Sequence, residues 1–260
     1  MTNRDTSNQT RILPIFSALL LAFALWAPQA IAQDTCYFVG GGGDNLWTTP
    51  GNWEGGDDFT ASDPQPDGSP CPATNGDIPD VNDGVPGKND SVIIMPDQTV
   101  EINFEFQDGA GIEDPLANVE LRSGTGSGSS DTRFDNFVQD NTLRIDGDLF
   151  VGSNTGFFYS IPGNGGDGDI TVGGDVTLND DLVTFAFDGS KFGQTAVQGD
   201  LTVEGNLTIG SGSTVNFTTL DALFSDLTVG GDLTNNGTLN ISFESAANSS
   251  TITFNGGSGT

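Results

Sequence analysis

Four copies of one pattern decide the fold of this chain: Leu143-Arg-Ile-Asp-Gly-Asp-Leu-Phe-Val151, Ile170-Thr-Val-Gly-Gly-Asp-Val-Thr-Leu178, Leu201-Thr-Val-Glu-Gly-Asn-Leu-Thr-Ile209 and Leu227-Thr-Val-Gly-Gly-Asp-Leu-Thr-Asn235. The glycine before the Asp or Asn falls at 147, 174, 205 and 231, so the steps are 27, 31 and 26 residues. Units of this size are too small to bury a core alone. They are typical of solenoids, in which neighbouring repeats stack on one another.

Apolar and polar residues alternate within each copy, which indicates short β-strands packed on one face. One unit accommodates three such strands with their turns, and stacked strands lie about 4.8 Å apart. We therefore expect an all-β fold, a right-handed parallel β-helix (β-solenoid), with Leu143, Ile170, Leu201 and Leu227 in one column. Glycines and asparagines are expected at corners that require a positive φ. An antiparallel sandwich is the alternative, because alternation alone fits both folds.

Residues 33–90 have a different composition, and we expect them to form a loop-rich N-terminal cap on a solenoid that covers 91–260. The segment contains seven prolines, which exclude a helix and a central strand. It also contains large aromatic side chains that require burial, among them Trp47 and Trp53.

The chain has two cysteines, Cys36 and Cys71, and both fall in the predicted cap. In an oxidising compartment such a pair indicates one disulfide, and two free thiols are the alternative. Two cysteines without histidine make a poor metal site. A disulfide that closes the loop between Cys36 and Cys71 would stabilise the fold by roughly 4 kcal/mol in the chain-entropy treatment.

Residues 1–32 have the layout of a secretory signal peptide, with Arg4 and Arg11 in a polar start, an apolar run over 15–26, and small residues at 30–32. The apolar run is shorter than the roughly 20 residues of a membrane-spanning helix; an uncleaved anchor is the alternative. No later run is long enough to cross a bilayer, so we expect a mature chain without a transmembrane segment. The expected location is secreted or at the cell surface, in a Gram-negative outer membrane or extracellular setting.

The charge of the chain excludes several classes of function. Lys and Arg supply 7 residues against 36 Asp and Glu, for a net charge of −29, and histidine is absent. Without histidine there is no Ser-His-Asp or Cys-His nucleophile site and no histidine-ligated zinc. So acidic a chain repels nucleic acid and anionic membranes, since both are bound mainly through Lys and Arg.

Two motifs in the cap carry a resemblance: Gly43-Asp-Asn-Leu-Trp47-Thr-Thr-Pro-Gly-Asn52-Trp53 and Val85-Pro86-Gly-Lys-Asn-Asp90-Ser-Val92-Ile-Ile94. With the Gly-Asp-rich repeats over 143–254, they resemble the N-terminal region of bacterial secreted and surface β-helix proteins, including autotransporter-like adhesin passengers and the cargo of C-terminal sorting domains. The resemblance implies an exported, capped β-helix and says little about a ligand. This chain departs from it by an insertion over 54–84. Similar proteins are usually longer, so we expect a short member or a solenoid truncated at its C-terminus.

A carbohydrate-active β-helix enzyme, a polysaccharide hydrolase or lyase, is one alternative function. Asp180 and Asp181 match the paired carboxylates of an inverting glycosidase, while Arg144 and Lys191 match groups that bind a substrate carboxylate. The Gly-His-Gly and Arg-Ile-Lys motifs of pectin-degrading hydrolases are missing. Adjacent aspartates in a turn are usually solvated corner residues, and that is the other interpretation of Asp180 and Asp181.

A calcium-stabilised extracellular binding module is the other alternative. Asp77, Asp80, Asp83 and Asp90 lie in a loop-rich segment, and carboxylate oxygens are the ligands that Ca²⁺ prefers. No strict EF-hand loop is present, and a soluble acidic surface explains the same residues.

The sequence therefore predicts an exported structural or adhesin-like β-solenoid protein without catalysis of its own. Its expected partners are extracellular glycans or other surface proteins, and its solenoid is expected to act as a stiff spacer.

Overall fold

The computed structural model describes residues 34–72, 84–102, 115–126, 132–136, 142–159, 169–179, 184–187, 200–219, 226–243 and 252–255. They belong to one compact unit, Gln33–Thr260. The predicted signal peptide lies outside the described residues. Apart from one short 3-10 turn, η1 (Pro50–Asn52), the regular structure of the described residues is entirely β. The chain is therefore all-β, as predicted.

The strands form three sheets. The first sheet contains β1 (Thr35–Phe38), β2 (Trp53–Gly56), β3 (Pro66–Pro70), β4 (Ser91–Ile94), β6 (Val119–Leu121), β9 (Leu149–Val151), β12 (Val176–Leu178), β15 (Leu207–Ile209) and β18 (Leu233–Asn235). The second contains β5 (Thr99–Ile102), β7 (Thr132–Asn136), β10 (Thr155–Tyr159), β13 (Thr184–Phe187), β16 (Thr214–Thr219) and β19 (Thr238–Phe243). The third contains β8 (Leu143–Ile145), β11 (Ile170–Val172), β14 (Leu201–Val203), β17 (Leu227–Val229) and β20 (Ile252–Phe254).

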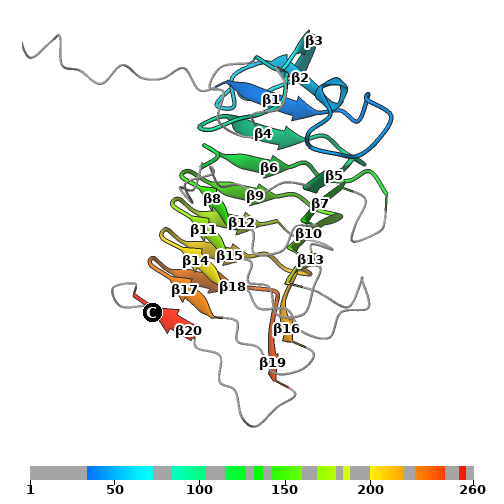
Figure 1. Ribbon diagram of the computed structural model, residues 1–260. Helices are drawn as coiled ribbons and strands as arrows, with labels where there is room; N and C mark the ends of the chain where they lie inside the picture. Colours follow the sequence, from blue (N-terminus) through cyan, green and yellow to red (C-terminus); the bar gives the residue numbers. More distant parts are fainter. Residues whose placement is uncertain are drawn as a thin grey trace, which may run out of the picture. The chain divides into compact units, whose positions relative to one another are not determined.

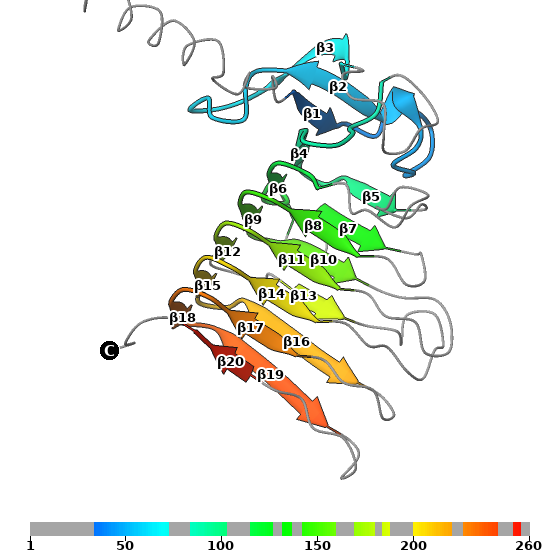
Figure 2. The same cartoon turned by 60° about the vertical axis from the view of Figure 1, so that its left-hand side comes forward.

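Successive coils stack in parallel, and each complete coil gives one strand to every sheet (Figures 1 and 2). The complete coils are β8–β10, β11–β13, β14–β16 and β17–β19. Leu143 pairs with Ile170, Ile170 with Leu201, and Leu201 with Leu227. The β-solenoid and its predicted column are thus confirmed, and the antiparallel sandwich is wrong.

The parallel stack begins before the sequence repeats do. Strands β4 and β6 pair in parallel in the first sheet, and β5 and β7 do so in the second. Even β1, inside the predicted cap, pairs in parallel with β4. Both β1 and β2 have a neighbour on each side, so the expectation that the prolines of this segment exclude a central strand is wrong: neither strand contains a proline. The stack ends at β2 and β3, which run antiparallel to their neighbours. Prolines 66 and 70 bound β3, as expected for an edge strand, since proline cannot donate a ladder hydrogen bond.

The core is a set of apolar columns that run from coil to coil. In the short strands of the first and third sheets from β8 to β17, the outer two residues are buried and the middle residue is partly exposed. In the second sheet Phe134 pairs with Phe157, and their rings stack with centroids 4.6 Å apart and an interplanar angle of 5°. Trp47 meets Phe134 edge-on, with centroids 6.3 Å apart, and so extends this column into the cap.

The corner between the third and first sheets is the same in every complete coil. Three residues connect each pair of strands, at 146–148, 173–175, 204–206 and 230–232. The last of the three is Asp148, Asp175, Asn206 or Asp232, and it forms a corner ladder that Asn118 extends. The side-chain Oδ1 of each ladder residue accepts a hydrogen bond from the backbone N–H of the next one, over 2.7–2.9 Å. Asp169, Asp200 and Asp226 repeat this arrangement at the start of the third-sheet strands.

The expectation that glycines and asparagines occupy corners with a positive φ holds between the first and second sheets, where Asn154 has a φ of 55° and Gly212 a φ of 82°. It is wrong for the glycines of the corner between the third and first sheets. The positive φ values among the described glycines occur at residues 40, 43, 68, 84 and 212. At the corner the constraint is close approach: a Cβ built on Gly174 would collide with the Asp148 carboxylate and would lie 2.7 Å from the carbonyl oxygen of Gly147. Gly205 and Gly231 face the same clash with the coil before them. Glycine is required because the backbones of neighbouring coils pass too closely for a side chain.

We expect Gly174→Ala to destabilise the protein by about 1–3 kcal/mol, since an extra methyl group in a closely packed site forces the backbone to shift. Chemical denaturation measures the loss. Glu204→Ala, at an exposed position on the next corner, is the control and should change stability by less than about 0.5 kcal/mol. Equal stability of the two variants would contradict the close-approach account.

Candidate functional site

The Asn-Trp motif of the cap is a buried hydrogen-bond network. Asn52 is fully buried, and its Oδ1 accepts a hydrogen bond from the backbone N–H of Gly42 over 2.7 Å. Its Nδ2 donates to Asp44 Oδ1 over 2.9 Å and to the carbonyl of Leu46 over 3.0 Å. The Asn52 hydrogen bond is the main cause of a lowered pKa at Asp44. Asn52 therefore fixes the glycine-rich loop onto η1, which is a structural role.

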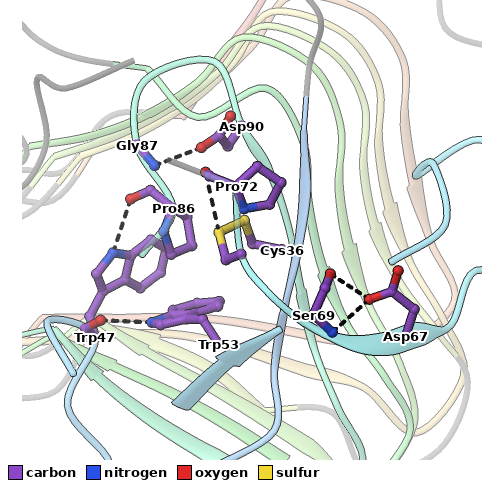
Figure 3. The surroundings of a disulfide bond; sticks show 10 residues. Cys36, Trp47, Trp53, Asp67, Ser69, Pro72, Pro86, Gly87 and Asp90 are labelled. Carbon is purple, nitrogen blue, oxygen red and sulfur yellow. Dashed lines mark hydrogen bonds between the residues drawn. A yellow bond between two sulfur atoms is a disulfide. The ribbon is translucent and has the colours of Figure 1, made fainter. Parts of the chain in front are cut away.

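The two tryptophans of the same motif pack at the centre of the cap (Figure 3). Trp53 donates from Nε1 to the carbonyl of Trp47 over 2.7 Å, and Trp47 donates to the carbonyl of Pro86 over 3.4 Å. Their ring centroids lie 4.6 Å apart, and Phe38 meets Trp53 at 5.0 Å. Both indole N–H groups are thus satisfied in a buried site, as the burial of tryptophan requires.

The Pro-Gly-x-x-Asp motif is a turn closed by its own carboxylate. Asp90 is buried, and its Oδ2 accepts a hydrogen bond from the backbone N–H of Gly87 over 2.8 Å (Figure 3). Asn89 has a φ of 65°, which suits asparagine better than most residues. Among the four residues proposed for calcium, Asp77, Asp80 and Asp83 lie outside the described residues. In the described part of the chain, no group of three or more acidic or cysteine side chains is arranged to hold a metal ion.

A disulfide joins Cys36 to Cys71, as predicted, with Cα atoms 5.3 Å apart. Cys36 lies on β1, with its side chain in the core, and Cys71 follows β3 directly. The bond therefore ties the outer hairpin β2–β3 to the first strand of the stack.

The segment that leads from β2 to β3, residues 57–65, lies as a strap on the outer face of the first sheet. The Tyr37 hydroxyl donates to the carbonyl of Asp57 over 2.7 Å, and the N–H of Phe59 donates to Thr35 Oγ1 over 2.9 Å. The Arg122 guanidinium donates to the carbonyl of Pro64. Because the strap covers it, Tyr37 is fully buried although its side chain faces outward, and burial raises its pKa to about 12.

Arg122 is positioned for this contact by Glu120, whose carboxylate lies 3.5 Å from the guanidinium. Burial raises the pKa of Glu120, and the positive charge of Arg122 partly offsets the rise. Glu120 stands on the outer face of β6, in the same row as Ile93 of β4. The row is therefore covered at its N-terminal end, and it becomes accessible further along the stack.

The structure brings no catalytic pair together among the residues that were proposed for one. Asp180, Asp181 and Lys191 lie outside the described residues. Arg144 stands on the outer face of β8, where its Nε lies 2.7 Å from Asp146 Oδ1 in an exposed ion pair. Its hydrogen bond to Asp146 holds the guanidinium at the corner of its own coil.

Two rows of threonine on the outer faces are the repeated polar surface of the described coils. On the third sheet, Arg144 is followed in register by Thr171, Thr202, Thr228 and Thr253. On the first sheet, Phe150 is followed by Thr177, Thr208 and Thr234. Sequence reasoning placed the buried columns but assigned no role to these rows. The signal was present, because threonine is the middle residue of every three-residue strand from β11 onward.

We expect a Cys36→Ser, Cys71→Ser double variant to lose about 2–5 kcal/mol of stability, because the disulfide restricts the unfolded chain. The loss should be confined to the cap, since the coils of a solenoid contact only their neighbours. Fluorescence of Trp47 and Trp53 reports on the cap during denaturation, because the third tryptophan, Trp26, is in the predicted signal peptide. A reducing agent should reproduce the effect in the wild type and leave the variant unchanged; an unshifted tryptophan transition would contradict this assignment.

The raised pKa of Glu120 predicts a pH dependence of a definite sign. Because the folded-state pKa is above the unfolded value, the folded protein holds this proton more tightly, and ionisation costs stability as the pH rises. Glu120→Gln cannot ionise. We expect the stability of the wild type relative to this variant to fall as the pH rises above the ordinary pKa of a glutamate, as measured by denaturation at each pH. The two proteins should be closest in stability at the acidic end, and a difference that grows in the opposite direction would refute the prediction.

Comparisons of the chain with protein-family models, with curated proteins and with solved structures find no match. The part of the chain that the structure describes contains no helix with the length and hydropathy needed to cross a membrane.

Proposed function

We propose that this chain is an exported bacterial structural protein of the cell surface or the medium, with an adhesin-like role and no catalysis of its own. In this role the stacked coils form a stiff spacer, and recognition takes place on its outer rows. The observation that carries the proposal is the continuous parallel stack, in which the distinctive side chains of the cap and of the corners hold neighbouring coils together.

The cap motifs support a structural reading of the resemblance to bacterial β-helix proteins. Asn52, Trp53 and Asp90 each make hydrogen bonds inside the cap, and all three are buried. These buried side chains close the end of the core, and their burial keeps them out of contact with a ligand. A capped end is what a solenoid requires to remain soluble and to avoid pairing with other strands.

The disulfide supports export. Disulfides form and persist in oxidising compartments such as the periplasm and the extracellular space, and are rare in the cytosol. Cys36 follows the predicted signal peptide by only a few residues, so the bond would form early after translocation. The acidic composition fits the same setting, because a large net charge keeps an extracellular protein soluble.

Expression of the full chain in a Gram-negative host, followed by cell fractionation and mass spectrometry, tests the proposal. We expect a product in the medium or at the cell surface that begins at Gln33 and contains the Cys36–Cys71 disulfide. The matched control carries Leu20→Arg in the apolar run of the predicted signal peptide and should remain inside the cell. A wild-type product that is cytosolic, reduced and still attached to residues 1–32 would refute export and the proposed role with it.

A further inference from the structure

The outer row of the first sheet differs from its counterpart on the third sheet at one end. We define the glycan strip as Phe150, Thr177, Thr208 and Thr234, which stand in register on β9, β12, β15 and β18. Phe150, Thr177 and Thr208 are partly exposed, and the residues on either side of each in its strand are buried. Thr234, on the last strand, is exposed. The corresponding row of the third sheet begins with Arg144, which is ion-paired to Asp146. On the first sheet, the accessible part of the row therefore begins with an aromatic side chain, Phe150, which follows Glu120 in register. On the third sheet, the row begins with a neutralised cation.

We propose that the glycan strip binds a neutral, linear polysaccharide that lies along the stack, with its first sugar ring against Phe150. This inference rests on the proposed extracellular role, and it adds a site and a class of ligand to it. A pyranose ring presents an apolar C–H face that packs on an aromatic ring, and hydroxyl groups that exchange hydrogen bonds with threonine. Phe150 supplies the aromatic surface, and the three threonines supply hydroxyl groups at each following coil.

The spacing of the strip favours an extended polymer. Strands β9, β12, β15 and β18 lie side by side in order (Figure 1), so strip residues recur about every 4.8 Å along a line. A row of this kind offers the same contact to each successive unit of a repeating chain. Threonine is stiff at χ1 because it is β-branched, so the row loses little conformational freedom on binding.

The charge of the strip selects a neutral glycan over an acidic one. The strip and its flanking residues in the same strands, 148–152, 175–179, 206–210 and 232–236, include Asp148, Asp175 and Asp232 but no Lys or Arg. On the preceding strand, Glu120 is the register neighbour of Phe150, and its carboxylate is paired with the Arg122 guanidinium over 3.5 Å, so this pair adds no net charge. The corner ladder holds Asp148 and Asp175 in place through the backbone of the next coil. Their negative charges repel uronic acids and sulfated sugars, and the net charge of −29 adds to this repulsion.

A protein partner fits the strip less well than a polysaccharide. Protein interfaces are usually centred on a buried cluster of aromatic, aliphatic or Arg side chains, whereas the strip offers one aromatic ring and then a line of hydroxyl groups. Pairing of a peptide strand is excluded on this face, because the residues lie on the surface of the first sheet and each of the three inner strands already has a neighbour on both sides.

Co-sedimentation of the purified exported protein with insoluble β-1,4-glucan measures the interaction. We expect the wild type to be retained, Phe150→Ala to bind about tenfold more weakly, and Phe150→Tyr, which keeps the ring, to bind like the wild type. The double variant Thr177→Ala, Thr208→Ala should bind several-fold more weakly. Its matched control, Thr202→Ala, Thr228→Ala on the third sheet, should bind like the wild type. Denaturation midpoints of all variants separate lost binding from lost folding.

Three results would overturn the proposal: no retention of the exported wild type on β-1,4-glucan, undiminished binding by Phe150→Ala, or an equal loss in the third-sheet control. Retention on a protein matrix or on polygalacturonate instead of glucan would assign the strip to another partner and would also overturn it. Each of these outcomes leaves the export test unaffected, so failure of the glycan strip is distinguishable from failure of the proposed function.

Discussion

The distance between neighbouring coils is the constraint on which the rest of this structure depends. Parallel pairing fixes that distance at about 4.8 Å, and every position of a coil must then fit the same position of the next. Apolar residues pair with apolar residues in the interior, as Leu143, Ile170 and Leu201 do. At the corner, the backbones come so close that only glycine fits, and the adjoining Asp or Asn uses the short distance to bond the next backbone N–H. The core and the corner therefore impose one common register.

The sequence predicts the interior better than the corners, and for a physical reason. Burial leaves an alternating pattern that repeats with each coil, so the columns and the parallel stack could be inferred from Leu143 and its counterparts. The role of Gly174 could not, because its constraint comes from Asp148 and Gly147 in the preceding coil. The same holds for the strap: nothing in the alternation shows that the Arg122 guanidinium reaches the carbonyl of Pro64, 58 residues away in the sequence.

The distinctive sequence motifs of this chain have structural roles in the cap, whereas the repeated coils form the surface that faces solvent. The most distinctive residues of the chain, Trp47, Asn52, Trp53 and Asp90, are buried and serve the cap. The least distinctive, the threonines in the middle of the short strands from β11 onward, form the regular surface that faces solvent. A cap must satisfy many different groups at once and so requires particular side chains, whereas a stacked face needs only the same side chain repeated. This is why the strongest motifs of the sequence carry little information about a ligand.

The constant three-residue corner between the third and first sheets restricts where the sequence can gain or lose residues during evolution. The steps of 27, 31 and 26 residues differ because the other connections differ in length, while this corner stays constant. Insertions are therefore tolerated in those connections without disturbing alignment, and duplication or deletion of one whole unit alters the height of the stack by a single increment. Natural selection can therefore change the length of the stack by whole coils. Each added coil also brings a threonine hydroxyl group in register with those of its neighbours.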